Sequence, residues 1–493
     1  MRNTLTESTI ITLVSFALFI PFLAVQYDTN GLAEAFAIES GNLIHKNHVL
    51  YGIVGYVGYS GLPLIGHASR AITVLQIINA ACGALGAGFA YAAYKGVTHD
   101  RLAAVVGTAF LVVSFLYWLF STDAAYITLA GMFANASMAA LIGMHSRVSA
   151  ILAGGLAAFS ILTWQASIFL IPALCLLSLQ VRSDVPKEIR RKDTVLYAAT
   201  ACIISGLTYT LIAFEQHGRM SASSLLRWFT SYGEGGTLPM WGKWEAQRTL
   251  LAARSALWSV VPVPLAIPVD QISWHVQKGR IAVDLALVGF GLLSLMALLK
   301  TRKSAVFFLL AYLVFIPFIV WWDPFQPKWF FIPNAFLAGF FAVALARWFR
   351  NPYASTAIFT ILLVIAATNF IVAIRPRHND IGLDSRIAQC VAEKMHPNDL
   401  LIAAEWGWPD YVKYLYGRKS LSVISEFSDV NARLDEVHRA GARAYITDPN
   451  EYSLDHLVWL EAQSHVSRED LTHLADAFAF KCYGSTILFA KTN

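Results

Sequence analysis

The sequence predicts a polytopic α-helical membrane protein with a small C-terminal α/β domain, and three observations lead to this fold class. The 493-residue chain has a mean hydropathy of +0.53, with 56% apolar and 14% charged residues. Soluble globular chains carry about 25% charged residues. Apolar runs of about 17 to 25 residues, long enough to cross a membrane as helices, recur up to Ile374, and a polar tail of about 110 residues follows them.

About eleven apolar runs are candidate membrane spans. Their approximate ranges are 8–26, 70–93, 102–120, 124–143, 148–162, 165–181, 195–214, 281–299, 304–322, 329–349 and 354–374. The first follows a short head without a small-residue cleavage motif, so it is interpreted as an uncleaved signal anchor. The run from Val148 to Leu179 could be one long helix or a hairpin. Basic residues flank both of its ends, which favours a hairpin that turns near Trp164 and Gln165.

The basic residues also predict the orientation in the membrane. Short loops with Lys95, Arg101, Arg347 and Arg350 fall on the side of the N-terminus, whereas the opposite short loops carry only Lys328. Under the positive-inside rule, the N-terminus is expected to be cytoplasmic and the tail to lie outside. This requires the apolar stretches 49–66 and 250–268 to be interfacial or re-entrant. Because topology explains the formal charge of +5, we expect no nucleic-acid partner.

Titratable residues gather in the first outer loop, residues 27–69. Asp28 comes directly after the first span and is expected to cap a helix that starts near Thr29. A carboxylate held there by a rigid helix could accept a proton or bind a divalent cation, so Asp28 is the leading catalytic candidate. Glu34 is a second catalytic candidate, and a solvated helix face is its alternative reading.

His45 and His48 follow in the same loop and, three residues apart, are expected to share one helical face. Their spacing is compatible with phosphate contact or with a metal ion, but two histidines without a third ligand do not define a metal site. We therefore assign no metal ligands, and leave cofactors open, a divalent cation among them. Tyr51 begins an aromatic-rich interfacial helix, and a turn is expected at Ser40 and Gly41.

Four further candidates come from the other outer loops. Asp123 ends the third span and is a third catalytic candidate, although it could equally cap the fourth span. Gln165 is a polar exception at the hairpin turn. Lys328 and Arg227 are candidate phosphate contacts, because cations with tryptophans nearby suit phosphorylated headgroups. Anchoring at the membrane surface is the alternative reading for the second outer segment, residues 215–280.

The tail, residues 383–493, alternates strand and helix patterns. "DLLIAAE", "SLSVIS", "RAYITD" and "STILFAK" are predicted strands, and "PDYVKYLYG" and "DVNARLDEVHRAG" are predicted helices that end at glycine. Without a phosphate loop or a catalytic triad order, this domain is expected to be a structural or acceptor-docking cap. Cys390 and Cys482 both lie in it, so a disulfide can form if the tail faces an oxidising compartment.

The arrangement of these motifs resembles the GT-C superfamily of polytopic glycosyltransferases, in particular its protein-mannosyltransferase-like and aminoarabinose-transferase-like members. The resemblance rests on Asp28 after the first span and on four segments, which are "NHVLY" at 47–51, "WLFSTDAAY" at 118–126, the hairpin around Trp164 and the late loop "WWDPFQPKWFFIP". It covers residues 8–374 and the outer tail. The chain departs from the protein-mannosyltransferase pattern because Asp28 is followed by Thr29 rather than by a second acid.

This resemblance implies inverting transfer of one sugar from a polyprenyl-phosphate donor to a lipid or glycan acceptor, with Asp28 as general base or metal ligand. It also implies a multi-pass protein in contact with membrane lipids, in a bacterial inner (plasma) membrane with a periplasmic or extracellular tail. Three alternatives stay open. A lipid-linked glycan ligase or polymerase would depend on the arginines and histidines of 215–280, and a non-catalytic scaffold subunit would act through the tail. A transporter is disfavoured because the spans hold almost no ionisable residues.

Overall fold

The computed structural model of the chain describes residues 2–61, 69–143, 146–181, 185–231, 242–262, 279–299, 303–405, 407–426, 429–452, 457, 460–461 and 466–491. Parts of the stretches 49–66 and 250–268, of the segment 215–280 and of the tail domain lie outside these described residues. The chain forms two compact units. The first contains Met1–Ala24, Leu43–Ile212 and Gly242–Asn379, and the second contains Val25–Asn42, Ala213–Trp241 and Asp380–Asn493.

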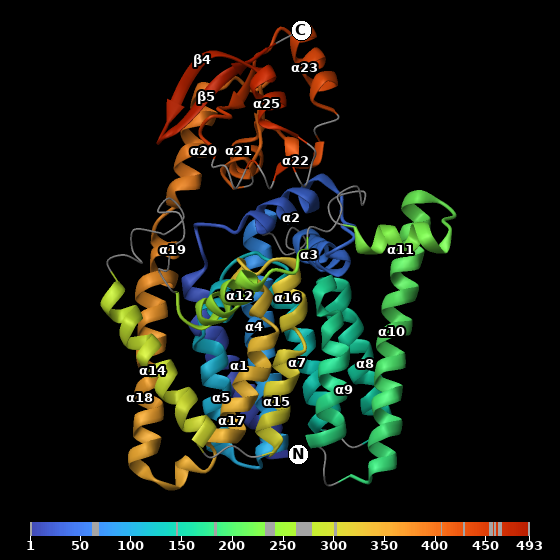
Figure 1. Cartoon of the computed structure of the whole chain (residues 1–493), viewed down its shortest axis with the longest axis vertical. Helices are drawn as coiled ribbons and strands as arrows, with labels where there is room; N and C mark the ends of the chain where they lie inside the picture. Colours follow the sequence, from blue (N-terminus) through green and yellow to red (C-terminus); the bar gives the residue numbers. More distant parts are fainter. Residues whose placement is uncertain are drawn as a thin grey trace. The chain divides into compact units, whose positions relative to one another are not determined.

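The first unit is a bundle of helices (Figure 1). Its α-helices, with α10 continuing into the second unit, are α1 (Arg2–Phe19), α3 (Val49–Gly61), α4 (Ala71–Thr98), α5 (Arg101–Val113), α6 (Phe115–Ser121), α7 (Ile127–Gly143), α8 (Arg147–Thr163), α9 (Leu170–Val181), α10 (Lys187–His217), α12 (Ala246–Val260), α14 (Arg280–Leu299), α15 (Lys303–Leu313), α16 (Ile316–Trp322), α17 (Pro333–Leu345), α18 (Pro352–Asn369) and α19 (Arg375–Asn379). Short turns of other helix types are η1 (Ile20–Phe22), η3 (Gln165–Phe169), η6 (Pro327–Phe330), η7 (Trp348–Arg350) and the π-helical η8 (Phe370–Ile374).

The expected polytopic membrane architecture is confirmed. Among the described residues, six helices are long and apolar enough to cross a membrane, and the bent pair α5–α6 would make a seventh. Each of the eleven predicted ranges falls on one helix or on consecutive helices. Four further apolar helices, including α7 and α17, are shorter than a full crossing, so the count of eleven spans stays a prediction.

Two interruptions shape the middle of this bundle. Ser114 has extended backbone angles between α5 and α6, and these two helices meet at an angle of 66°. Trp164 is also extended and separates α8 from η3, as the hairpin interpretation requires. At both interruptions, backbone N–H and C=O groups lack the hydrogen bonds that a continuous helix would give them. Within a membrane protein such groups must find hydrogen-bond partners inside the protein.

The second unit combines α2 (Thr29–Ser40) with the tail domain. Its other helices are α11 (Ala222–Thr230), α20 (Gly382–Lys394), α21 (Trp408–Tyr416), α22 (Val423–Glu426), α23 (Val430–Arg439) and α25 (Arg468–Leu474). Its strands are β1 (Leu400–Ala403), β2 (Lys419–Ser422), β3 (Ala444–Thr447), β4 (Ala475–Cys482) and β5 (Ser485–Ala490), in the order β2-β1-β3-β5-β4. β1 pairs in parallel with β2 and β3, whereas β5 is antiparallel to β3 and β4.

This sheet confirms the predicted α/β character of the tail, with two differences. β4 was not predicted, and the predicted strand "SLSVIS" ends early because Val423–Glu426 is helical. Residues of β1 and β3 are buried along their whole length and form the core with α23, through Ile402, Leu434 and Ile446. The disulfide between Cys390 and Cys482 is present and ties α20 to the end of β4.

Candidate functional site

Four breaks between helices of the first unit come together at one place. They are the turn at His45–His48 before α3, the loop between α6 and α7, Trp164 after α8, and η6. The Gln165 N–H donates to the Asn47 carbonyl at 3.4 Å, which joins the first and third of these breaks. Three of the four are short loops that the sequence predicts on the outer side of the membrane. The convergence defines the candidate site, which we call the loop site.

Aromatic rings connect the four breaks. The His48 ring stacks on Tyr126 with centroids 3.4 Å apart, and on His45 at 5.0 Å. Tyr126 contacts Trp164 at 6.4 Å, and Trp164 stacks on Trp329 of η6 at 5.3 Å. The result is a row of rings from the histidine pair to the tryptophan pair, in which His48, Tyr126 and Trp164 are buried.

The loop between α6 and α7 is held by side chains from other helices. Asn79 on α4 donates to the carbonyls of Asp123 at 2.8 Å and Ala125 at 2.7 Å. Gln76, one turn earlier on α4, donates to the Thr122 carbonyl of the loop at 3.4 Å and to the Ala24 carbonyl at 2.6 Å, and the Tyr51 hydroxyl donates to the Ala124 carbonyl. These bonds satisfy buried backbone groups that no helix can satisfy, and they fix the position of Tyr126.

Asp123 lies at the centre of this loop and is fully buried. Its carboxylate accepts from the Ala124 N–H at 2.7 Å and from the Arg377 guanidinium at 2.6 Å. Arg377 belongs to α19, and His378 beside it contacts the Leu23 carbonyl at 2.8 Å. Asp123 is therefore a buried, ion-paired carboxylate.

The two histidines lie in a turn, not on the helical face expected for them, because the His48 N–H donates to the His45 carbonyl at 2.9 Å. Burial lowers the pKa of His48 well below its usual value, and the charges of His45 and Lys328 act in the same direction. His48 is therefore neutral at pH 7. Its Nδ1 atom is buried without a hydrogen-bond partner in the described part of the chain. Burial also lowers the pKa of the neighbouring Lys46 to about 8.

Lys328 marks the other end of the row of rings. Its ammonium lies 5.6 Å from the centre of the Trp329 ring, and the Trp329 indole N–H faces the Asp323 carboxylate at 3.5 Å. Burial raises the pKa of Asp323, while Lys328 opposes this effect. Arg248, half a turn into α12, donates to the carbonyls of Val320, Trp321 and Trp322 and thereby closes the end of α16.

Asp28 and Glu34 lie on α2 in the second unit. Asp28 is the N-cap of α2, as expected, because its carboxylate accepts from the Asn30 N–H at 3.0 Å and from the Asn30 side chain at 2.8 Å. Glu34 is buried, not on the solvated face that was its alternative reading. α21 packs on α2, with the Tyr411 hydroxyl donating to the Tyr27 carbonyl and the Tyr414 hydroxyl to Glu39.

The structure thus brings five candidates together in the loop site: His45, His48, Tyr51, Asp123 and Gln165, with Lys328 at its far end. Arg227 is exposed on α11 in the second unit. Sequence reasoning did not single out Arg377, Asp323 or Trp329 as site residues. The only signal for Arg377 in the sequence is its place just after the last apolar run, and topology alone explains an arginine there.

Comparisons with solved structures show which fold this is. The chain is similar to ArnT from Cupriavidus metallidurans in the apo state, with a TM-score of 0.60 over 98% of this chain and 97% of that chain at 12% identity. ArnT bound to undecaprenyl phosphate matches equally well. The Archaeoglobus fulgidus oligosaccharyltransferase matches with a TM-score of 0.55 over 99% of this chain and 76% of that chain at 13% identity. The chain has the GT-C fold.

The likeness to this fold spans both units, so the fold expected from the motifs is confirmed. No protein-family model and no curated protein sequence matches the chain. A further oligosaccharyltransferase structure of the same fold, at 10% identity and a TM-score of 0.53, is a complex with zinc and sulfate. Since the fold alone does not assign an activity, the chemistry must be argued from the residues.

The histidine pair fits a divalent cation by its donor chemistry. Ligand nitrogen atoms of His45 and His48 lie within 4.8 Å of each other, and the orphaned Nδ1 of neutral His48 offers a lone pair. Neutral imidazole is a common ligand of zinc and related ions.

Proposed function

We propose that this protein is a glycosyltransferase that moves a sugar from a polyprenyl-phosphate donor to a lipid or glycan acceptor at the outer face of the membrane. The observation that carries the proposal is the loop site, where a row of aromatic rings runs from a buried neutral histidine to Lys328. Rings pack on sugar faces, and the cation suits the donor phosphate. The complex of ArnT with undecaprenyl phosphate supports the choice of donor.

In the proposed reaction, an acceptor oxygen forms a bond to the anomeric carbon of the sugar. The bond from that carbon to the phosphate oxygen breaks, and polyprenyl phosphate leaves with the electron pair. Asp28 takes the proton of the acceptor hydroxyl, because its carboxylate is held at the start of α2. Lys328 is proposed to stabilise the charge that develops on the leaving phosphate. Asp123, held by Arg377, is proposed to keep the loop site in place and to contribute negative charge there.

The remaining candidates are proposed to bind substrate or a cation. Glu34 is proposed as a further catalytic carboxylate on α2, and a divalent cation held by His45 and His48 would supply positive charge for the donor phosphate. Tyr51 and Gln165 are proposed to position the donor from α3 and η3. Arg227 is proposed to contact phosphorylated headgroups from α11, and the tail domain, residues 383–493, to dock the acceptor.

Transfer from a labelled donor tests the proposal. Purified full-length protein is given radiolabelled polyprenyl-phosphate sugars and a membrane-lipid extract as acceptor, and we expect label to move to the acceptor. Asp28→Asn should reduce the rate by about 10² to 10⁴, the usual contribution of a positioned base. Asparagine is as good an N-cap as aspartate, so the variant should keep α2 and fold normally.

The controls separate the site from the fold. Asp435→Asn, on α23, removes an acid of the second unit far along the chain from α2 and should transfer at the wild-type rate. Repeating the assay after chelation, with and without added Zn²⁺, reports whether transfer needs a cation. Equal rates for wild type and Asp28→Asn would remove Asp28 from the mechanism, and no transfer from any donor would favour the scaffold alternative.

A further inference from the structure

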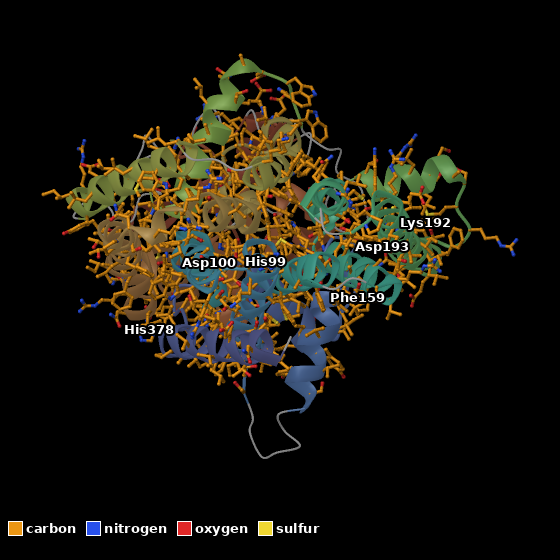
Figure 2. The ribbon with its side chains drawn as sticks, turned by 90° about the horizontal axis from the view of Figure 1, so that it is seen from below. His99, Asp100, Phe159, Lys192, Asp193 and His378 are labelled. Carbon is orange, nitrogen blue, oxygen red and sulfur yellow. A yellow bond between two sulfur atoms is a disulfide. The ribbon has the colours of Figure 1, made fainter. Side chains whose placement is uncertain are left out.

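A cavity lies at the end of the first unit opposite the loop site. α5 starts beside this cavity and the α5–α6 pair ends at the loop site, while α17 starts just after η6 and ends beside the cavity. It has a volume of about 360 Å³ and is lined by Thr98, His99, Asp100, Leu102, Ala346, Phe349 and Arg350. Figure 2, which views the molecule from below, shows His99 and Asp100 next to each other on this end of the bundle.

The lining combines unpaired polar groups with apolar surface. In the described part of the chain, the side chains of His99 and Arg350 have neither a hydrogen bond nor an ion pair, and both are exposed. Leu102, Ala346 and Phe349 supply the apolar wall. A free guanidinium beside an apolar wall is suited to a phosphate group attached to a hydrocarbon chain.

Two neighbouring basic residues, unlike Arg350, form ion pairs. Lys95 and Arg101 lie close to the cavity in sequence, but both pair with Glu7, at 3.0 and 3.3 Å. The Tyr91 hydroxyl also donates to Glu7 at 2.6 Å, so this cluster is satisfied within the bundle. Arg350 therefore has a positive charge that no acidic side chain of the described helix bundle neutralises. Because Arg350 lines the cavity, this charge is available to a ligand there.

Asp100 limits which phosphate can enter. One of its carboxylate oxygens accepts from the Ala103 N–H at 3.0 Å and caps α5, so the acid is held in the lining. Its charge disfavours a bare dianion and favours a ligand that brings its own hydrogen-bond donor next to the phosphate. Phospholipid headgroups with an ammonium or hydroxyl group beside a phosphodiester have this composition.

His99 adds an independent argument. Its backbone has φ +52°, a left-handed conformation that glycine adopts at lower cost, and its N–H closes α4 on the Lys95 carbonyl at 2.9 Å. The helix end does not need an imidazole. Glycine at this position would end α4 more easily, so the side chain of His99 is the feature that requires an explanation.

We propose that this cavity binds the headgroup of a membrane phospholipid, with Arg350 and His99 on the phosphodiester and Asp100 on the donor group of the headgroup. The site is separate from the proposed glycosyl transfer. Its occupant would hold the corner between α4 and α5 against the end of α17, whose far end begins beside the loop site.

Lipid retention tests this proposal. Full-length protein is delipidated in detergent and given dilauroyl phosphatidylglycerol, dilauroyl phosphatidylethanolamine or dilauroylglycerol, and bound lipid is counted by native mass spectrometry alongside the melting temperature. We expect one retained phospholipid and a rise of several degrees with either phospholipid, and neither effect with dilauroylglycerol. Arg350→Gln should weaken retention at least fivefold.

Two further variants keep the test decisive. His99→Gly relaxes the backbone while it removes the imidazole, so it should fold at least as well as wild type and yet retain about two- to fivefold less lipid. Arg347→Gln removes a charge three residues away that does not line the cavity, and should retain lipid within twofold of wild type. Equal retention by wild type, Arg350→Gln and His99→Gly would overturn the proposal. Sodium phosphate that raises the melting temperature as much as lipid would identify free phosphate as the ligand and overturn the lipid assignment.

Discussion

Glu405, two residues after the end of β1, is a single side chain whose environment changes its affinity for protons. Burial raises the pKa of Glu405 to about 7, and the charges of Asp384 and Glu451 add to this effect. A folded-state pKa above the unfolded value means that the folded protein binds more protons. The stabilisation is present below the unfolded pKa, near 4.5, and is lost as the pH rises through about 7.

We therefore predict that Glu405→Gln unfolds like wild type near pH 4 but becomes the more stable protein above pH 7. A pKa difference of this size corresponds to about 3 kcal/mol, so the expected gain at pH 8 is about 2 to 3 kcal/mol. Melting temperatures of the full chain from pH 4 to pH 8 measure it. Glu436→Gln, at an exposed site on α23, is the control, and a pH trend shared by both variants would contradict the prediction.

Single residues could be predicted from the sequence where their partners are local. The cap formed by Asp28 could be predicted because its partner is the N–H of Asn30, two residues away. The helix ends at Gly417 and Gly441 could be predicted because they also depend on local residues. The partner of Asp123 was not, because Arg377 is 254 positions further along the chain. Which buried acid meets which base depends on helix packing, and a single sequence does not encode that packing as a pattern.

At the scale of elements, the apolar runs were enough to predict the long helices of the first unit. The break at Trp164 could be predicted because basic residues flank both ends of its apolar run, which favours a hairpin over one crossing. The apolar pattern was not enough for β4, whose segment "ADAFAFKC" is mostly exposed or half-buried and lacks a continuous apolar run. Asn79 was recognisable as a polar exception within a span, but its task of holding the carbonyls of the α6–α7 loop was not.

That loop provides the element-scale prediction, since Arg377 ties it to α19. Arg377→Ala leaves the fully buried Asp123 without its counter-ion, which should cost about 3 to 5 kcal/mol of stability. The double variant Asp123→Asn/Arg377→Gln removes both charges and should recover most of the loss, because an uncompensated buried charge is the main cost. Thermal unfolding measures each variant.

Arg375→Ala is the matched control for this cycle, because Arg375 is exposed two residues earlier and should change stability by less than about 0.5 kcal/mol. If the losses of stability caused by Asp123→Asn alone and by Arg377→Gln alone add up to the loss in the double variant, the ion pair does not hold the loop. In that case the hydrogen bonds from Asn79 and Tyr51 would have to carry the loop alone.

For the whole molecule, the fold places the loop site at one end of the first unit and the cavity lined by Arg350 at the other. The loop site is built at breaks between helices, where the Asn47, Asp123 and Ala125 carbonyls take hydrogen bonds from other elements. The short loops at the opposite end carry Arg347 and Arg350. This arrangement fits the proposed function. The basic residues at one end would hold that end in the cytoplasm, and the loop site at the other end would receive a lipid-borne donor on the outer side.

The disulfide between Cys390 and Cys482 makes that orientation testable, because disulfides persist where the compartment is oxidising. We predict that the tail domain faces outwards and that the start of α18, at Tyr353, faces the cytoplasm. In a background with Cys82, Cys175 and Cys202 replaced by serine, Phe478→Cys and Tyr353→Cys place a thiol at two exposed sites. A membrane-impermeant maleimide should label Phe478→Cys in intact cells, and should label Tyr353→Cys only after the membrane is opened. Labelling of Tyr353→Cys in intact cells would show that the topology is the reverse of the predicted one. The loop site would then lie on the cytoplasmic side, and the proposed transfer at the outer face would be wrong.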